Sequence, residues 1–301
     1  MLSILRVKLL VRGFYGHLFS GKLVKTILIR KVPELADLFK PTVGSAPKLV
    51  HVSPLFKISS SGVECIYSYV KCHSEVVKCS GPVIPVKLDG LYDFYFGFTN
   101  SVLSLTKGVE AVLGIDECFE FMGQEVCVAT REVEYIDAKT LAREIASKVI
   151  ESGKVKIVFA SPTMLRDPLR RSKYKSFSPT PFNLFSTPIY AIQYITGQYS
   201  PRRLRLHLMI LHRILNETYS IYKTTRVKWV LYGKRPEPAI VGYINYYLNK
   251  DYLEQYSKVL NINEYLAEVF AATMTLGIGA GRTAGFGHVF IEPSIVERAE
   301  N

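Results

Sequence analysis

The chain has 301 residues, of which 48% are hydrophobic and 21% are charged, a balance typical of globular rather than disordered proteins. The formal net charge of +12 favours a polyanionic partner, because each phosphate that a lysine or arginine neutralises releases a condensed counterion. A basic protein without such a partner has the same composition. No stretch approaches the roughly 18 uncharged apolar residues of a membrane-spanning helix. The amino-terminal segment also lacks the features of a signal peptide, so we expect a cytoplasmic protein with no membrane partner.

The chain contains five cysteines, whose spacing bears on metal binding and redox state. They include no Cys-x-x-Cys pair, and zinc sites are normally built from such closely spaced ligands, so we expect neither a metal nor a cofactor. We interpret the cysteines as buried packing residues in a reducing compartment, although disulfides occur inside hyperthermophiles and cannot be read from this sequence. The five residues are Cys65, Cys72, Cys79, Cys118 and Cys127.

Apolar periodicity divides the first half of the chain into strands and helices. Apolar residues at helical spacing predict a helix over 18–31, which stops at Pro33. Asn100 can cap a short helix that runs to Leu113. Alternating or β-rich runs predict strands at 2–12, 48–58, 63–73, 91–98 and 117–135.

Asp137 can cap a further helix, in which apolar residues recur at helical spacing and which ends at Gly153. The second half of the chain then repeats the order of the first. A long basic loop follows its first strand, and a helix is expected over 201–222. The remaining elements are strands at 155–165, 226–233, 239–248 and 285–292, with a helix at 262–276 before the last strand.

Two successive β-α-β-β-α-β units predict an α+β protein made of tandem ferredoxin-like (RRM-like) domains. We expect an amino-terminal domain over 1–136, a linker helix over 137–153 and a carboxy-terminal domain over 154–301. This fold hosts many functions and indicates none by itself. Its open sheet face is nevertheless common among RNA-binding proteins.

A glycine-rich segment over 277–287 is the most specific local pattern, with five glycines in eleven residues. Glycines allow positive φ angles and let backbone N–H groups approach an anion closely. Arg282 is expected at the tip of this loop, where its forked guanidinium suits a phosphate. A tight helix-to-strand connection explains the same glycines without a ligand, and the segment matches neither a dinucleotide fingerprint nor a P-loop. The predicted RNA contacts are Gly277, Gly279, Gly281, Arg282, Gly285 and Gly287.

Glycine–hydrophobic–glycine on either side of five residues that include a basic one resembles the carboxy-terminal signature of the CRISPR repeat-processing endoribonucleases of the RAMP superfamily. Residues 277–279 and 285–287 match its two ends, and Arg282 is the basic residue between them. Residues 161–163 (Ser-Pro-Thr) and 239–243 resemble the family as well. The resemblance implies a metal-independent endoribonuclease of antiviral defence. Such an enzyme cleaves CRISPR repeat RNA by 2′-hydroxyl attack, leaves 2′,3′-cyclic phosphate and 5′-hydroxyl ends, and so produces mature CRISPR RNA.

Many members of that family carry a tyrosine, a histidine and a lysine on and after the first helix, and this sequence departs from the pattern. Lys25 stands at the tyrosine position, Lys40 near the histidine position and Lys48 at the lysine position. Lys22 lies on the same helical face as Lys25. If these lysines converge, mutual repulsion favours deprotonating one of them, which then serves as a proton carrier while the others stabilise the phosphorane. We predict Lys25 and Lys48 as catalytic, followed by Lys22 and Lys40. A basic helix face that only holds RNA explains the same residues.

His17 and His51 are alternative acid–base groups, because the pKa of a histidine lies near neutral pH. His17 precedes the first helix, and His51 follows Lys48 in a strand. Either could be the missing base. A lone histidine is nevertheless more often a hydrogen-bonded structural residue.

Further RNA contacts are predicted in two basic segments. Basic side chains interleaved with aromatic ones can hold phosphates and stack on unpaired bases, although an ordinary exposed loop has the same composition. The predicted residues are Arg170, Arg171 and Lys173 in the loop after the strand at 155–165, and Lys234 and Arg235 in the later hairpin.

The resemblance implies CRISPR repeat RNA as the partner and subunits of a CRISPR effector complex as recipients of the product. Whether the chain forms a homodimer stays open. A non-catalytic RNA-binding subunit of an effector complex is the main alternative, because it would have the same fold and glycine loop. An unrelated ferredoxin-like protein that binds a small anionic ligand is a third reading.

Overall fold

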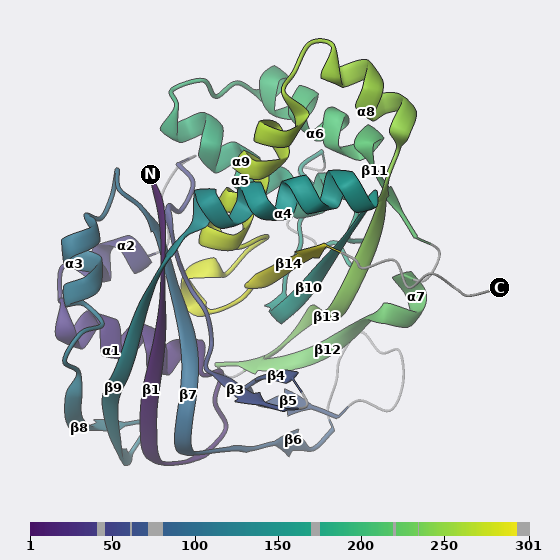
Figure 1. Ribbon diagram of the computed structural model, residues 1–301. Coiled ribbons are helices and arrows are strands. Elements are labelled where there is room, and N and C mark those ends of the chain that lie inside the picture. The colour runs from purple at the N-terminus through teal and green to yellow at the C-terminus, as the bar shows by residue number, and fades with distance from the viewer. Residues whose placement is uncertain are drawn as a thin grey trace.

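The computed structural model describes residues 1–40, 46–60, 62–71, 81–169, 175–218, 221–233 and 235–293. These residues form two antiparallel sheets against which the helices pack (Figure 1), and this arrangement confirms the predicted α+β class. Within the described ranges, no helix combines the length and the hydropathy that crossing a membrane requires.

The first sheet is built on two long central strands, β1 (Leu2–Gly16) and β7 (Val86–Thr99), which pair antiparallel over most of their length. Inward-facing side chains of these strands and of three helices fill one hydrophobic core. The strands lie in the order β4 (Gly62–Cys65), β3 (Phe56–Ser59), β7 (Val86–Thr99), β1 (Leu2–Gly16), β9 (Gln124–Asp137) and β8 (Asp116–Phe121), with β2 (Val50–Val52) also paired to β7. The helices are α1 (Gly21–Lys31), α2 (Leu35–Phe39) and α3 (Leu105–Glu110).

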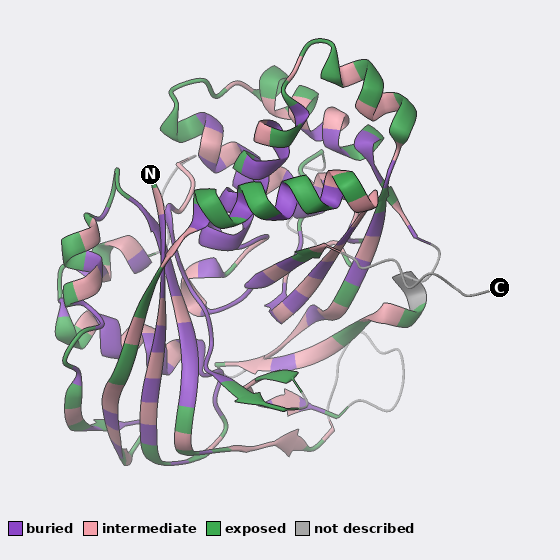
Figure 2. Ribbon diagram, viewed as in Figure 1, coloured by how far each residue is buried: buried purple, intermediate pink, exposed green. Residues whose placement is uncertain are grey.

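The second sheet is covered by a layer of helices at the top of Figure 1 and has its own core. Figure 2 shows α4 (Ala138–Ser152) with exposed residues along its outer side, while its buried residues pack toward α9 (Ile262–Leu276). The strand order is β14 (Val289–Pro293), β10 (Lys154–Thr163), β13 (Arg235–Leu248), β12 (Thr225–Tyr232), β5 (Tyr69–Val70) and β6 (Val83–Ile84), with β11 (Leu215–Glu217) also paired to β13. The helices are α4 (Ala138–Ser152), α5 (Pro181–Ile195), α6 (Pro201–Ile214), α7 (Ile221–Thr224), α8 (Lys250–Ser257), α9 (Ile262–Leu276) and the 3₁₀ turn η1 (Arg282–Ala284).

The two halves of the chain are joined by strand pairing and by an aromatic cluster. β5 and β6 come from the first half but extend the second sheet through β12. Phe19 stacks on Phe286 of the glycine loop at 4.3 Å between ring centroids, and Val230 and Ala239 of the second sheet complete this cluster. The glycine loop is therefore packed against the start of α1. The domain boundaries at 136 and 153 stay predictions.

The local signals at helix ends predicted some elements well and others poorly. α9 spans the predicted residues 262–276, and the side chain of Asp137 caps α4 by accepting hydrogen bonds from the backbone N–H groups of residues 139 and 140. The capping residue of α3 is Ser104 rather than Asn100. The helix predicted over 201–222 ends as α6 at Ile214. α5 and α8 were not predicted, and α5 occupies part of the segment interpreted as a basic loop.

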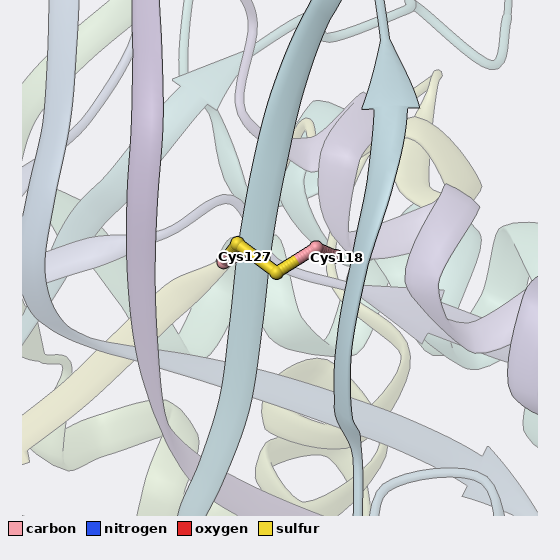
Figure 3. The surroundings of a disulfide bond; sticks show 2 residues. All are labelled: Cys118 and Cys127. Atoms are coloured by element: carbon pink, nitrogen blue, oxygen red, sulfur yellow. A yellow bond between two sulfur atoms is a disulfide. The ribbon is translucent and has the colours of Figure 1, made fainter.

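Cys118 and Cys127 form a disulfide between β8 and β9 (Figure 3), so the interpretation of every cysteine as a packing residue is wrong for this pair. The two residues are direct partners in the strand register, which brings their Cα atoms to 4.0 Å. The register of β8 against β9 pairs the two cysteines, and the spacing of cysteines in the sequence did not reveal this register. Cys65 is a free thiol, and Cys72 and Cys79 lie outside the described residues.

Candidate active site

Two of the predicted catalytic lysines meet at the carboxy-terminal end of α2. The ammonium of Lys48 donates to the carbonyl of Leu38 at 2.9 Å, and that of Lys25 on α1 donates to the carbonyl of Phe39 at 3.4 Å. The last carbonyls of a helix carry partial negative charge and attract cations. Each ammonium has three hydrogens, so both groups keep donors for a substrate.

The surroundings of these lysines make their ammonium groups easier to deprotonate. Burial lowers the pKa of Lys25 and of Lys22. Burial also lowers the pKa of Lys48, and the positive charges of Lys25 and Arg282 lower it further. Lys48 therefore lies close enough to two other cations for their charge to act on it, as the sequence interpretation required.

The other two predicted lysines have different surroundings. The ammonium of Lys22 lies 4.6 Å from the ring centroid of Tyr232 on β12, so it faces the second sheet. Lys40 is exposed and forms an ion pair with Asp37 at 2.6 Å. Lys22, Lys25 and Lys48 have no carboxylate partner among the described residues. We therefore group Lys25 and Lys48 as the lysine pair and leave Lys40 outside it.

Arg282 is not at an exposed loop tip, and that expectation is wrong. Its side chain is 6% exposed, and its guanidinium donates to the carbonyls of Leu276 at 2.7 Å and of Lys48 at 2.9 Å. Burial lowers its pKa to about 10, so the group stays charged at neutral pH. The guanidinium holds protein backbone rather than presenting itself to a phosphate.

His51 is buried in a hydrogen-bonded chain and does not face solvent, so its candidate role as the base is not supported. Its Nδ1 lies 2.9 Å from the carbonyl oxygen of Arg282, and its Nε2 lies 3.0 Å from Nδ1 of His288. A carbonyl can only accept, so His51 Nδ1 carries the hydrogen and His288 Nδ1 donates to His51 Nε2. Burial holds the pKa of His51 well below its usual value and lowers that of His288 to about 3. His17 is exposed beside α1.

The glycines of the loop permit close backbone packing. A Cβ atom on Gly287 would lie 1.9 Å from the carbonyl oxygen of Ile278, and one on Gly279 would lie 2.3 Å from that of Met164. The N–H groups of Gly277 and Gly287 donate to protein carbonyls. These contacts fit the alternative interpretation of a tight helix-to-strand connection. A phosphate contact by Gly277, Gly279, Gly281, Gly285 or Gly287 stays a prediction.

Most of the predicted basic RNA contacts belong to segments outside the described residues. Arg170, Arg171, Lys173 and Lys234 lie outside the described residues, and Arg235 begins β13 without a described side chain.

The structure adds a basic surface that the sequence interpretation missed. Arg202, Arg203 and Arg205 in the first turns of α6 are exposed and line a hollow of about 610 Å³ together with His207 and Met209. The run of arginines was visible in the sequence, but this helix was predicted from its apolar spacing alone.

Residues 157–289 match the family model of the CRISPR-associated endoribonuclease Cas6. The carboxy-terminal part of the chain is therefore similar to the Cas6 family. The matched residues include the glycine loop, and the match confirms the resemblance that the loop carries. No curated protein sequence matches the chain.

Solved structures share the fold of this chain at low sequence identity. A Cas6 product complex is 15% identical with a TM-score of 0.57, covering 97% of this chain and 100% of that one. Thermus thermophilus Cas6 is 14% identical with a TM-score of 0.51, covering 97% and 98%. A RAMP protein binding different RNA substrates is 12% identical with a TM-score of 0.50, covering 96% and 99%. These similarities confirm the tandem ferredoxin-like fold.

Proposed function

We propose that this protein is a metal-independent endoribonuclease that cleaves CRISPR repeat RNA by 2′-hydroxyl attack and so produces mature CRISPR RNA. The observation that supports this most is the lysine pair, since Lys25 and Lys48 meet at the end of α2 without a carboxylate partner among the described residues. The match of residues 157–289 to the Cas6 family model supports this class of reaction. The product would then pass to subunits of an effector complex.

The lysine pair supplies what this reaction requires. In the proposed mechanism, Lys48 in its neutral form accepts the proton of the 2′-hydroxyl as the 2′-oxygen bonds to the adjacent phosphorus. The ammonium of Lys25 stabilises the crowded phosphorane and gives a proton to the 5′-oxygen as the P–O5′ bond breaks. The products are a 2′,3′-cyclic phosphate and a 5′-hydroxyl, with one proton taken up and one released. The lowered pKa of Lys48 favours its assignment as the acceptor.

RNA binding is supported by the charge distribution as well as by the family. The net charge is +12, and the arginine surface of α6 provides three guanidinium groups in one place. Guanidinium groups contact phosphates in a forked geometry. Binding by Arg170, Arg171, Lys173, Lys234 and Arg235 stays part of the proposal.

The test is to incubate repeat RNA with the protein in EDTA, with a matched RNA that carries deoxyribose at the nucleotide whose 2′-hydroxyl attacks. We expect the all-ribose RNA to be cut to cyclic phosphate ends and the substituted RNA to bind equally well without being cut. Cutting of the deoxy RNA contradicts the chemistry. Tight binding of both RNAs without any cutting identifies a non-catalytic subunit instead. A salt slope near zero points to a small-ligand protein, since each phosphate contact on a single strand contributes a log–log slope of about −0.7.

A further inference from the structure

The glycine loop is connected to the lysine pair through the side chain of Arg282. Its Nη1 donates to the carbonyl of Leu276 at the end of α9, and its Nη2 donates to the carbonyl of Lys48. One guanidinium therefore bridges two backbone segments that are more than 200 positions apart in the chain. The guanidinium of arginine presents several donors in one rigid planar group, so it can hold two carbonyls in a fixed geometry.

The backbone of Arg282 is held by two buried histidines. Its carbonyl accepts the hydrogen bond from His51 on β2, and His51 is in turn paired with His288. The N–H of His288 donates to the hydroxyl of Ser161 at 2.8 Å. A Cβ atom on Gly277 would lie 3.0 Å from the His51 ring, so glycine leaves the ring just enough room. These contacts fix the position of the guanidinium.

Lys48 has few charged neighbours, and they are all positive. Within the described parts of the chain, the charges that act on its ammonium are Lys25 from α1 and Arg282 from η1, while the Leu38 carbonyl of α2 accepts its hydrogen bond. Arg282 keeps its charge at neutral pH, so its repulsion of the Lys48 ammonium is permanent. The same side chain therefore positions Lys48 mechanically and acts on it electrostatically.

We propose that Arg282 is a positioning residue that couples the glycine loop to catalysis by tethering the Lys48 backbone and keeping a permanent positive charge beside the Lys48 ammonium. This inference rests on the proposed function, since it assumes that Lys48 moves the proton. It differs from the expectation that Arg282 grips the RNA backbone. The loop acts on the reaction through Lys48, and RNA affinity does not depend on the guanidinium.

The proposed role of Arg282 predicts how the pH dependence of the cleavage rate changes when its charge is removed. Lys48 must be neutral to accept a proton, so the cleavage rate rises with pH through the Lys48 pKa. Removing the positive charge of Arg282 raises that pKa, because one of the charges that lowers it is gone. The rising part of the pH–rate profile then moves to higher pH. A purely structural role for Arg282 does not move it.

The experiment compares Arg282→Met with Arg282→Lys, and uses Arg143→Met as the control. Arg143 forms a two-pronged ion pair with Glu264 of α9, so its loss removes an interhelical contact that none of the described contacts connects to Lys48. For each variant, the pH profile of kcat, the dissociation constant of uncut deoxy-substituted repeat RNA and the unfolding midpoint are measured. The titration of Lys48 itself is followed by its rate of acylation against pH, with mass spectrometry of the Lys48 peptide.

For Arg282→Met we expect kcat at neutral pH to fall roughly ten- to a hundredfold, the magnitude of a small misplacement of a catalytic group. The RNA dissociation constant stays within about twofold, because the guanidinium is buried and donates to protein carbonyls. Both the Lys48 titration and the kcat profile move to higher pH. Arg282→Lys keeps the charge but loses one carbonyl contact, so kcat falls while the Lys48 titration stays near that of the parent protein.

Several results would overturn the inference. One is an unchanged Lys48 titration in folded Arg282→Met, and another is a loss of RNA affinity that accounts for the lower activity. An equal fall in kcat for Arg143→Met also contradicts it, because general destabilisation then explains the effect. If Arg282→Met does not fold, Arg282→Lys decides, since loss of RNA binding in that variant contradicts a positioning role. The Lys48 titration is readable even if the parent protein cuts no RNA, so failure of the proposed function is seen separately.

Discussion

The lysine pair and Arg282 are neighbouring cations that the fold uses in opposite ways. Lys25 and Lys48 are partly exposed, and each gives one hydrogen bond to a carbonyl of α2. Arg282 is buried, and its guanidinium donates to two backbone carbonyls of different segments. A flexible ammonium with donors to spare suits a changing substrate, whereas a rigid fork suits a permanent support. Charge alone therefore does not reveal which cations of this protein meet RNA.

The largest expected effect is the loss of activity on replacing a residue of the partly exposed lysine pair. Replacing Lys48 or Lys25 by alanine should lower kcat by roughly 10²- to 10⁴-fold, because a proton carrier or a phosphorane-stabilising charge is lost. Single-turnover cleavage of repeat RNA at saturating protein measures it. Lys31→Ala is the matched control on the same helix, since the Lys31 ammonium donates to the Gly114 carbonyl and not to α2. If the two active-site variants cut as fast as this control, the lysine pair is not catalytic.

A smaller effect, a loss of stability, is expected on replacing a glycine of the buried loop that carries Arg282. Gly287 has a φ of 75° and its added Cβ would lie 1.9 Å from the Ile278 carbonyl oxygen, so Gly287→Ala forces the loop to move. Combining left-handed strain with overpacking, we expect a loss of roughly 2–5 kcal/mol in urea unfolding. Gly114→Ala is the control, because Gly114 also has a positive φ of 62° but no heavy atom within 4 Å of the added Cβ. It should lose only about 1–2 kcal/mol. Equal losses would show that the loop is less tightly packed than its contacts indicate.

A further expected effect is a pH dependence of stability that arises from His51, which contacts the Arg282 carbonyl, and from its partner His288. His51 and His288 are neutral in the folded protein, whereas an unfolded histidine binds a proton below about pH 6.5. Their contribution to stability is therefore fully present above about pH 6.5 and is lost as the pH falls toward the folded His288 pKa of about 3. Each buried histidine adds a slope of up to about 1.4 kcal/mol per pH unit in this window.

Urea unfolding between pH 4.5 and 7.5 measures this slope for the parent protein and for His288→Phe. The variant should be less stable at neutral pH, because the Nε2 of His51 loses its donor, but its stability should depend less on pH. His212→Phe, at an exposed histidine of α6, should keep the parent slope. A parent slope retained in His288→Phe would mean that other groups dominate the acid sensitivity.

The helices show which parts of the fold were readable from local sequence. α9 and α4 were predicted because capping residues and apolar spacing act within a few positions, as with Asp137 and Gly153 at the two ends of α4. α5 was missed because the segment after the strand at 155–165 was interpreted as a long basic loop, and the helix begins at Pro181 and contains Pro188. A proline at the first position of a helix is tolerated, because its missing N–H has no partner there in any case. Burial of one side of α5 against α6 and α9 then stabilises the helix despite Pro188.

The sequence by itself determined the α+β class, the order of most elements, the glycine loop and the two lysines that meet at α2. These features depend on composition, on spacing and on a motif within one short segment. Only the tertiary structure decided that Arg282 is buried, that His51 is closed off by His288, and that the α6 arginines are exposed. Burial and the pKa of an ionisable group are set by atoms that pack around it from distant parts of the chain. A residue type and its neighbours in sequence do not contain that information.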